Sequence, residues 1–229
     1  MEFTFSPPPQ PSVAIVGSGV RFPVRRIFCV GRNYADHVRE MGNDPKSEPP
    51  LFFSKPADAV VESGASISYP SNTSNFHHEV ELVIAIGKGG ANIPEGSAIN
   101  HVWGYGVGVD LTRRDRQAEA KKAGTPWDTA KGFDQSAPIS ALTPLASSGD
   151  VTNARIWIAV NGEMRQDANT RDMIWSVREI IAALSRWWDL KAGDLIFTGS
   201  PSGVSALNPG DEIECGIDGL APLRFSIAR

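Results

Sequence analysis

The chain has 229 residues, 41% of them hydrophobic and 21% charged, a balance that predicts one sizeable globular domain with its own core. Its formal net charge of -4 excludes the broad cationic surface that nucleic acids and anionic membranes require, so we expect neither as a partner. No apolar run approaches the roughly 20 residues of a membrane span, and the N-terminus lacks a secretory signal pattern, which predicts a cytoplasmic protein.

The first part of the chain is expected to be an N-terminal arm, residues 1–22, followed by a single domain over 23–229. Prolines between Pro7 and Pro11 predict an extended segment, and short strands are predicted at 12–16 and 26–30. The GSG at 17–19 lacks a full dinucleotide-binding fingerprint and is interpreted as a turn. Residues 33–42 (NYADHVREMG) predict a short helix, which a proline-rich loop follows.

Residues 79–86 and 102–111 are apolar and β-branched or glycine-rich, which predicts two buried strands. A charged helix is predicted within 112–124. The clearest helical periodicity runs over 171–188 and indicates core packing through Ile174, Val177, Ile181, Leu184 and Trp188.

Two units near the C-terminus, at 192–199 and 209–216, repeat a Gly-Asp turn followed by a strand. Strands outnumber helices and do not alternate with them, which favours an α+β, strand-rich fold over a doubly wound sheet. Cys29 and Cys215 lie within two strand-like stretches, RIFCVG and DEIECG, so we expect buried free thiols rather than a disulfide.

Three acidic residues form a candidate metal site. Glu79 and Glu81 are two apart on a predicted strand and so share a face, although such a pair alone more often faces solvent. Asp110 ends the glycine-rich strand and could add a third oxygen. Carboxylates without cysteine favour magnesium, manganese or calcium over zinc. A zinc site using His78 stays open as an alternative, but His77 and His78 are expected to pack nearby or face solvent.

A candidate base lies in the predicted helix over 33–42. His37 and Glu40 are three residues apart and share a face, so the carboxylate could orient the imidazole as a general base that activates water. An ordinary surface pair fits the same spacing, and Lys131, in TAKGF, is by itself equally compatible with a surface lysine.

Six blocks in order resemble the fumarylacetoacetate hydrolase superfamily, in its smaller acylpyruvase-like branch: IFCVGRNYADHVREMG, LFFSKP, HHEVELVIAIGKG, GYGVGVDLTRRDRQ, PWDTAKGFDQSAP and DLIFTGSPSGV. The resemblance implies a mixed β-sandwich roll of the C-terminal-domain type as the catalytic domain, a homodimer, and one Mg²⁺ or Mn²⁺ ion on Glu79, Glu81 and Asp110. It implies catalytic roles for His37, Glu40 and Lys131, and substrate contacts from Arg114, Gln117, Lys131 and Ser200.

The function implied is hydrolysis of a carbon–carbon bond in an acylpyruvate, above all fumarylpyruvate to fumarate and pyruvate in the breakdown of aromatic acids such as gentisate. His37, oriented by Glu40, would deprotonate the attacking water, and Lys131 would stabilise the pyruvate enolate that leaves. The alternatives are an oxaloacetate decarboxylase, a maleylpyruvate or acetylpyruvate hydrolase, an isomerase of a related 2-oxo acid, and a catalytically silent metal-stabilised binding domain.

Overall fold

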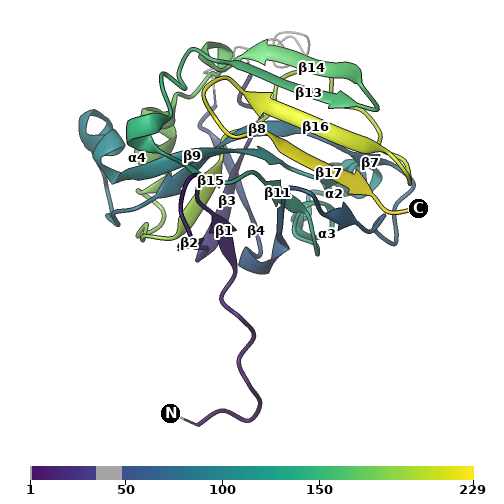
Figure 1. Ribbon diagram of the computed structural model, residues 1–229, viewed down its shortest axis with the longest axis horizontal. Helices are drawn as coiled ribbons and strands as arrows, with labels where there is room; N and C mark the ends of the chain where they lie inside the picture. The colour runs from purple at the N-terminus through teal and green to yellow at the C-terminus, as the bar shows by residue number, and fades with distance from the viewer. Residues whose placement is uncertain (1, 35–47) are drawn as a thin grey trace.

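The computed structural model describes residues 2–34 and 48–229, and the fold below is that of those residues. Two stacked β-sheets dominate it, and the short helices lie at their margins (Figure 1). The fold is therefore α+β and strand-rich, as the sequence predicts.

The larger sheet has eight strands: β3 (Arg26–Gly31), β4 (Leu51–Lys55), β5 (Val60–Glu62), β8 (Val80–Ile86), β9 (Val102–Val109), β11 (Ala137–Ile139), β12 (Thr143–Pro144) and β15 (Asp194–Phe197). Their order is β4-β3-β15-β8-β9-β11-β5, and β12 also pairs with β9. The interior strand β15 is parallel to β3 and antiparallel to β8. The interior strands of this sheet are mostly apolar because both of its faces are covered.

The smaller sheet has five strands: β6 (Ser66–Ile67), β13 (Arg155–Val160), β14 (Glu163–Asn169), β16 (Glu212–Ile217) and β17 (Leu223–Ile227). In the order β14-β13-β16-β17-β6, it lies over β8 and β9 (Figure 1). Leu82 and Ile84 of β8 join the core between the sheets, whereas Val83 and Ala85 join a second core on the opposite face. This alternation follows from the two-residue period of a strand.

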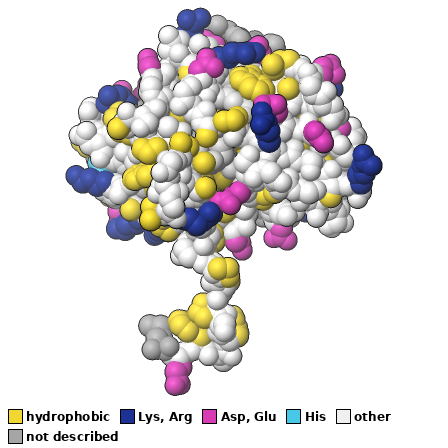
Figure 2. Space-filling view, in the orientation of Figure 1, with side chains coloured by type: hydrophobic (Ala, Val, Ile, Leu, Met, Phe, Trp, Pro, Cys, Tyr) yellow, Lys and Arg dark blue, Asp and Glu magenta, His cyan; other side chains and the backbone are white. Residues whose placement is uncertain are grey.

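A hairpin of β1 (Ser12–Ala14) and β2 (Arg21–Pro23) contributes Val13 and Phe22 to the second core. The predicted turn at 17–19 joins the two strands, with Gly17 at φ 70°. The predicted division between residues 22 and 23 falls inside β2 and stays a prediction. Residues 2–9 run away from the body as an extended arm with exposed Phe3 and Phe5 (Figures 1 and 2).

The elements that flank the large sheet near the candidate site are short. β7 (Phe76–His77) pairs with β10 (Thr112–Arg113), and α2 (Arg114–Ala123) and α3 (Asp128–Lys131) follow β10. Helix α2 confirms the predicted charged helix and ends at Gly124, which is left-handed at φ 67°. Short 3₁₀ helices complete the connections: η1 (Ala57–Ala59), η2 (Glu95–His101), η3 (Leu145–Ser147) and η4 (Thr170–Asp172).

The helix predicted over 171–188 is wrong in extent, because α4 spans only Val177–Leu184. A capping box between Ser176 and Glu179 starts it, and the preceding residues form η4 and an extended link. Ile174 is buried without being helical, and Trp188 is 36% exposed, so the core stripe is shorter than predicted.

Other sequence predictions can be placed directly. Cys29 and Cys215 are buried free thiols, as expected. The predicted helix over 33–42 and its loop lie almost entirely outside the described residues. Within the described part of the chain, no helix is long and apolar enough to cross a bilayer. On the face drawn in Figure 2, acidic and basic side chains are scattered among one another.

Candidate metal centre and substrate cavity

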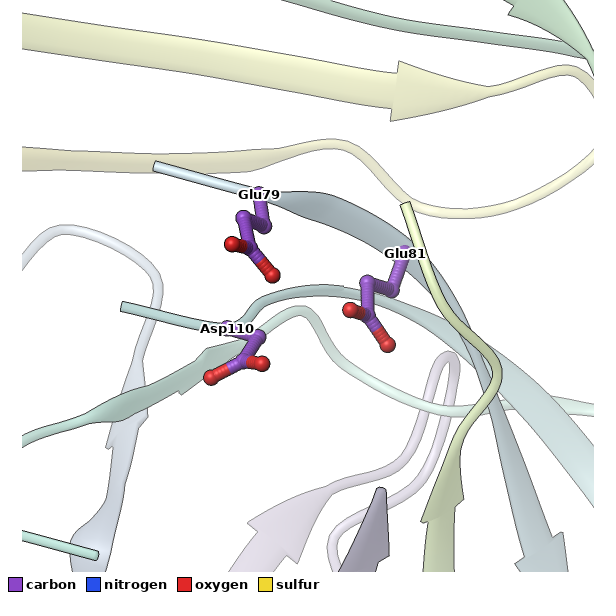
Figure 3. A group of neighbouring side chains, drawn as sticks. All are labelled: Glu79, Glu81 and Asp110. Atoms are coloured by element: carbon purple, nitrogen blue, oxygen red, sulfur yellow. The ribbon is translucent and has the colours of Figure 1, made fainter. Parts of the chain in front are cut away.

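Three carboxylates converge at one end of the large sheet. Glu79 immediately precedes β8, Glu81 lies within it, and Asp110 immediately follows β9, so the antiparallel pairing of these strands places the three side by side (Figure 3). One ligand atom from each lies within 4.8 Å of the others. Glu81 and Asp110 are 1% and 0% exposed, so this is a buried cluster and not a solvated acidic face.

Close packing of β9 makes this approach possible. A Cβ at Gly108, which pairs with Glu81, would lie 2.5 Å from a ring carbon of Phe197 and 2.6 Å from a methyl of Val83. The glycine therefore allows β15, β8 and β9 to lie against one another directly below the carboxylates.

Lys131, at the end of α3, is buried among these acids rather than exposed. Its Nζ lies 2.9 Å from Glu79 Oε2, 2.5 Å from Asp110 Oδ2 and 2.7 Å from Thr112 Oγ1. Burial works against the charged ammonium, but Asp110 and Glu79 outweigh it and raise the pKa of Lys131 above its usual value. The lysine is therefore a fixed cation at the floor of the site.

A second buried lysine was missed by the sequence reasoning. Lys55, the last residue of β4, has its Nζ 2.8 Å from Asp110 Oδ1, an ion-pair distance without hydrogen-bond alignment. The same ammonium donates to the carbonyl oxygens of Leu111 and Lys131. Lys55 thus fixes both the carboxylate and the backbone that carries Lys131. Its block, LFFSKP, resembles the family, but nothing local marks the lysine as buried.

Arg114 and Gln117 lie on one face of α2, at its start. Arg114 donates to Glu79 Oε1 at 2.5 Å and to Gln117 Oε1 at 2.6 Å. Burial alone would raise the pKa of the Glu79 carboxyl, but the Lys131 and Arg114 cations lower it to about 2. Glu79 is therefore ionised at any physiological pH.

Glu81 is held differently. Its Oε2 accepts from the backbone N–H of Gly199 at 2.7 Å, and no Lys or Arg among the described residues lies within ion-pair distance of it. Burial, and then the charges of Asp110 and Glu79, raise the pKa of Glu81 well above its usual value. Its carboxylate is the point in the cluster where a further positive charge is needed.

A buried glutamine, also missed, ties this region together. Gln166 Oε1 accepts from Val80 N at 3.1 Å and from His78 Nδ1 at 3.0 Å, and its Nε2 donates to Ser200 Oγ and Pro201 O. His78 Nε2 accepts from Ser205 Oγ at 2.9 Å. Both ring nitrogens of neutral His78 thus have hydrogen-bond partners. His78 also lies outside the acidic cluster, so it does not supply the ligand that the zinc alternative requires.

The cluster opens into a cavity of about 380 Å³. Its polar wall includes Glu79, Glu81, Arg114, Gln117, Lys131 and Ser200, so all but one of the predicted site residues within the described part of the chain line it. The exception, Asp110, lies beneath the floor. The apolar wall contains Tyr34, Phe53, Trp127 and Val204. His37 and Glu40 lie outside the described residues, and their predicted roles stay predictions.

The residues present fit a divalent metal ion. Glu79, Glu81 and Asp110 offer only oxygen donors, they are buried and close together, and Glu81 has no side-chain cation of its own among the described residues. Hard ions such as Mg²⁺ and Mn²⁺ prefer such oxygen sets. The neighbouring space is a cavity and not packed protein, so further ligands could come from water or substrate.

Comparison with known proteins adds to this geometry. Residues 26–228 match the family model described as fumarylacetoacetate (FAA) hydrolase C-terminal. The chain belongs to the fumarylacetoacetate hydrolase family. It is accordingly an enzyme of this family, and the predicted family and fold are confirmed.

Family members with three different activities are similar to it. The crystal structure of fumarylpyruvate hydrolase from Pseudomonas aeruginosa in complex with Mn²⁺ and pyruvate is 50% identical, with a TM-score of 0.95 over 99% of both chains. The mitochondrial oxaloacetate tautomerase FAHD1 of Mus musculus is 47% identical over 90% of this chain and 92% of its own. The mitochondrial oxaloacetate decarboxylase of Dictyostelium discoideum is 45% identical over 89% of this chain and 94% of its own.

Proposed function

We propose that this family member hydrolyses an acylpyruvate, most of all fumarylpyruvate, to a carboxylic acid and pyruvate. The observation that carries the proposal is the buried triad of Glu79, Glu81 and Asp110, ringed by cations at the floor of a cavity. The 50% identity to a fumarylpyruvate hydrolase crystallised with Mn²⁺ and pyruvate supports the choice of substrate.

The three carboxylates would hold one Mg²⁺ or Mn²⁺ ion. When bound, such an ion supplies positive charge that favours the carboxylate and 2-oxo oxygens of the substrate and lowers the cost of negative charge as the bond breaks. Lys131 presents a fixed ammonium at the same place. Its three N–H donors are directed to Glu79, Asp110 and Thr112, so it would stabilise an enolate oxygen through its positive charge and not through a further hydrogen bond.

In the proposed reaction, water adds its oxygen to the distal carbonyl carbon. The bond from that carbon to the adjacent methylene then breaks, and the methylene takes up a proton to become the methyl group of pyruvate. His37, oriented by Glu40, is proposed to remove the proton from water. Arg114, Gln117 and Ser200 line the cavity and would orient the substrate.

A second candidate function is the tautomerisation or decarboxylation of oxaloacetate. The identities of 47% to an oxaloacetate tautomerase and 45% to an oxaloacetate decarboxylase favour it. Neither reaction needs an activated water, and both pass through the same stabilised enolate. Decarboxylation breaks the C3–C4 bond and releases carbon dioxide, whereas tautomerisation moves a proton between C3 and the 2-oxygen and so still needs a group that accepts and returns that proton.

The experiment is pyruvate release from fumarylpyruvate, acetylpyruvate and oxaloacetate, with Mg²⁺ or Mn²⁺ and an EDTA control, together with enol–keto conversion of oxaloacetate. EDTA-sensitive cleavage of fumarylpyruvate that collapses in His37→Ala supports the hydrolase. Activity on oxaloacetate alone would replace it by the second function, and decarboxylation, which needs no base, should then persist in His37→Ala. Wild-type rates in Glu81→Gln would reject the metal-dependent assignment altogether.

A homodimer and a cytoplasmic location complete the proposal. Light scattering of the purified protein tests the first, through a mass twice that of one chain.

A further inference from the structure

Two basic residues of the cavity wall have no carboxylate partner among the described residues. Lys55, Lys131 and Arg114 all form ion pairs with Glu79 or Asp110. Arg32 and Lys121 line the same cavity, yet neither forms an ion pair with any acid in the part of the chain that the structure describes. Within residues 2–34 and 48–229, the cavity wall therefore carries two positive charges that no acidic side chain pairs with.

Their placement separates them from the metal end. Arg114, Gln117, Ala118 and Lys121 all line the cavity, and their spacing puts them on one face of α2. Arg114 contacts Glu79, whereas Lys121 comes seven residues later, about 10 Å further along a helix that rises 1.5 Å per residue. The helix face thus runs from the carboxylate triad to a second, cationic end of the cavity.

Lys121 is oriented by an aromatic wall. Its Nζ lies 5.2 Å from the centre of the Trp127 ring, which also lines the cavity. Burial, and then the nearby charges of Arg32 and Arg114, lower the pKa of Lys121. Arg32 immediately follows β3 and has a left-handed conformation at φ 58°, so the chain turns at this residue. Arg32 and the last two residues of β3 line the cavity. The two cations therefore face the same space from different elements.

We infer that Arg32 and Lys121 form a subsite for the distal carboxylate of the substrate, so that the enzyme selects 2-oxo acids with a second carboxylate at the far end over acylpyruvates that end in an alkyl group. The inference rests on the proposed function, which places the 2-oxo acid end of the substrate at the carboxylate triad. Fumarylpyruvate has such a carboxylate, and acetylpyruvate does not.

The experiment compares 2-oxopimelate with 2-oxoheptanoate, two ligands of equal chain length that differ in having a carboxylate or a methyl group at the far end. Their affinities for the Mn²⁺-loaded protein are measured by titration calorimetry in the wild type, Lys121→Met and Arg32→Gln. Lys122→Met is the matched control, because Lys122 adjoins Lys121 on the same helix, is exposed and does not line the cavity.

The wild type is expected to bind 2-oxopimelate at least tenfold more tightly than 2-oxoheptanoate. Lys121→Met and Arg32→Gln should each reduce that preference about fivefold, as expected for loss of one partly exposed charge-assisted contact, and leave 2-oxoheptanoate affinity unchanged. Lys122→Met should keep the full preference.

The inference is overturned if the wild type shows no preference, if Lys121→Met weakens both ligands equally, or if Lys122→Met lowers the preference as much as Lys121→Met. If neither ligand binds the wild type, the result overturns both the inferred subsite and the placement of the 2-oxo acid end at the triad. A charge-dependent preference in a protein that does not cleave fumarylpyruvate would reject the proposed reaction and leave the subsite standing.

Discussion

Lys55 Nζ and Asp110 Oδ1 lie 2.8 Å apart, both fully buried, while the other oxygen of the same carboxylate is held by Lys131. Asp110 is thus clamped between two ammonium groups that arrive from β4 and α3. Lys131 lines the cavity, whereas Lys55 and Asp110 lie beneath its floor.

Lys55→Met should lower the free energy of unfolding by about 3 kcal/mol, because it removes one partner of a buried ion pair and two donors to backbone carbonyls. Urea titration measures this. Lys88→Met, at an exposed site, should change stability by less than about 0.5 kcal/mol. Equal effects of the two substitutions would contradict the buried role of Lys55.

Glu81→Gln should have opposite effects with and without metal. In EDTA the variant should be at least as stable as the wild type, because the folded protein raises the pKa of Glu81 and so disfavours its charged form. At a Mn²⁺ concentration 100 times its Kd, the wild type should gain about 2.7 kcal/mol and the variant should gain almost nothing. Thermal melts in both conditions measure the difference, and an equal Mn²⁺ shift in the variant would remove Glu81 from the ligand set.

Gly199→Ala should destabilise the protein and weaken Mn²⁺ binding. Gly199 has φ 95°, and a Cβ there would lie 2.6 Å from Asn33 Cβ and 3.0 Å from Val30 O, so the N–H that holds Glu81 must move. Gly64 has φ 92° with no atom within 4 Å of a Cβ, which makes Gly64→Ala the control for backbone strain alone.

We expect a cost of about 1 kcal/mol for Gly64→Ala and about 2 kcal/mol more for Gly199→Ala. Chemical denaturation gives both values, and calorimetry gives the Mn²⁺ affinity. A Gly199→Ala protein with unchanged Mn²⁺ affinity would show that the Gly199 N–H does not position Glu81.

His77 should make stability depend on pH between about 6.5 and 4. Burial, and then Arg114, lower the pKa of His77 from 6.5 to about 4 in the folded protein. Between these values the unfolded chain binds a proton that the folded chain does not, so the contribution is complete above pH 6.5 and is lost as the pH falls through 4.

Allowing for solvent screening of a half-buried ring, the loss should be about 1 kcal/mol. His77→Gln should therefore lose less stability than the wild type between pH 7 and pH 5, although His78 leaves some slope in both because its pKa is lowered as well. Parallel pH profiles of the two proteins, measured by urea titration, would contradict the assignment.

The part of the site that sequence could predict is the part that depends on local geometry. Glu79 and Glu81 share a face because a strand has a period of two, and Asp110 joins them because it ends the next strand. Lys55 could not be found in this way, since its burial depends on the pairing of β4 with β3 and on the approach of α3.

The misplaced helix has a different cause. The prediction extended the helix back to residue 171 because Ile174 lies three residues before Val177, which is a helical spacing. Ile174 is buried, but it lies in an extended link, and a buried residue there satisfies the same spacing. The start signal was present in the sequence as Ser176 followed three residues later by Glu179. At the other end, periodicity alone could not show that Trp188 lies beyond the last helical turn.

The parallel pairing of β3 with β15 joins Arg26 to Asp194, which are 168 residues apart. Such a contact carries a large loop-closure cost and forms only when nearly the whole chain is available. The N–H of Gly199 lies 118 residues beyond Glu81 in the sequence, so this hydrogen bond can form only after the chain has been synthesised through residue 199. A chain that stops before β15 would carry all three carboxylates but would lack the backbone donor that holds Glu81.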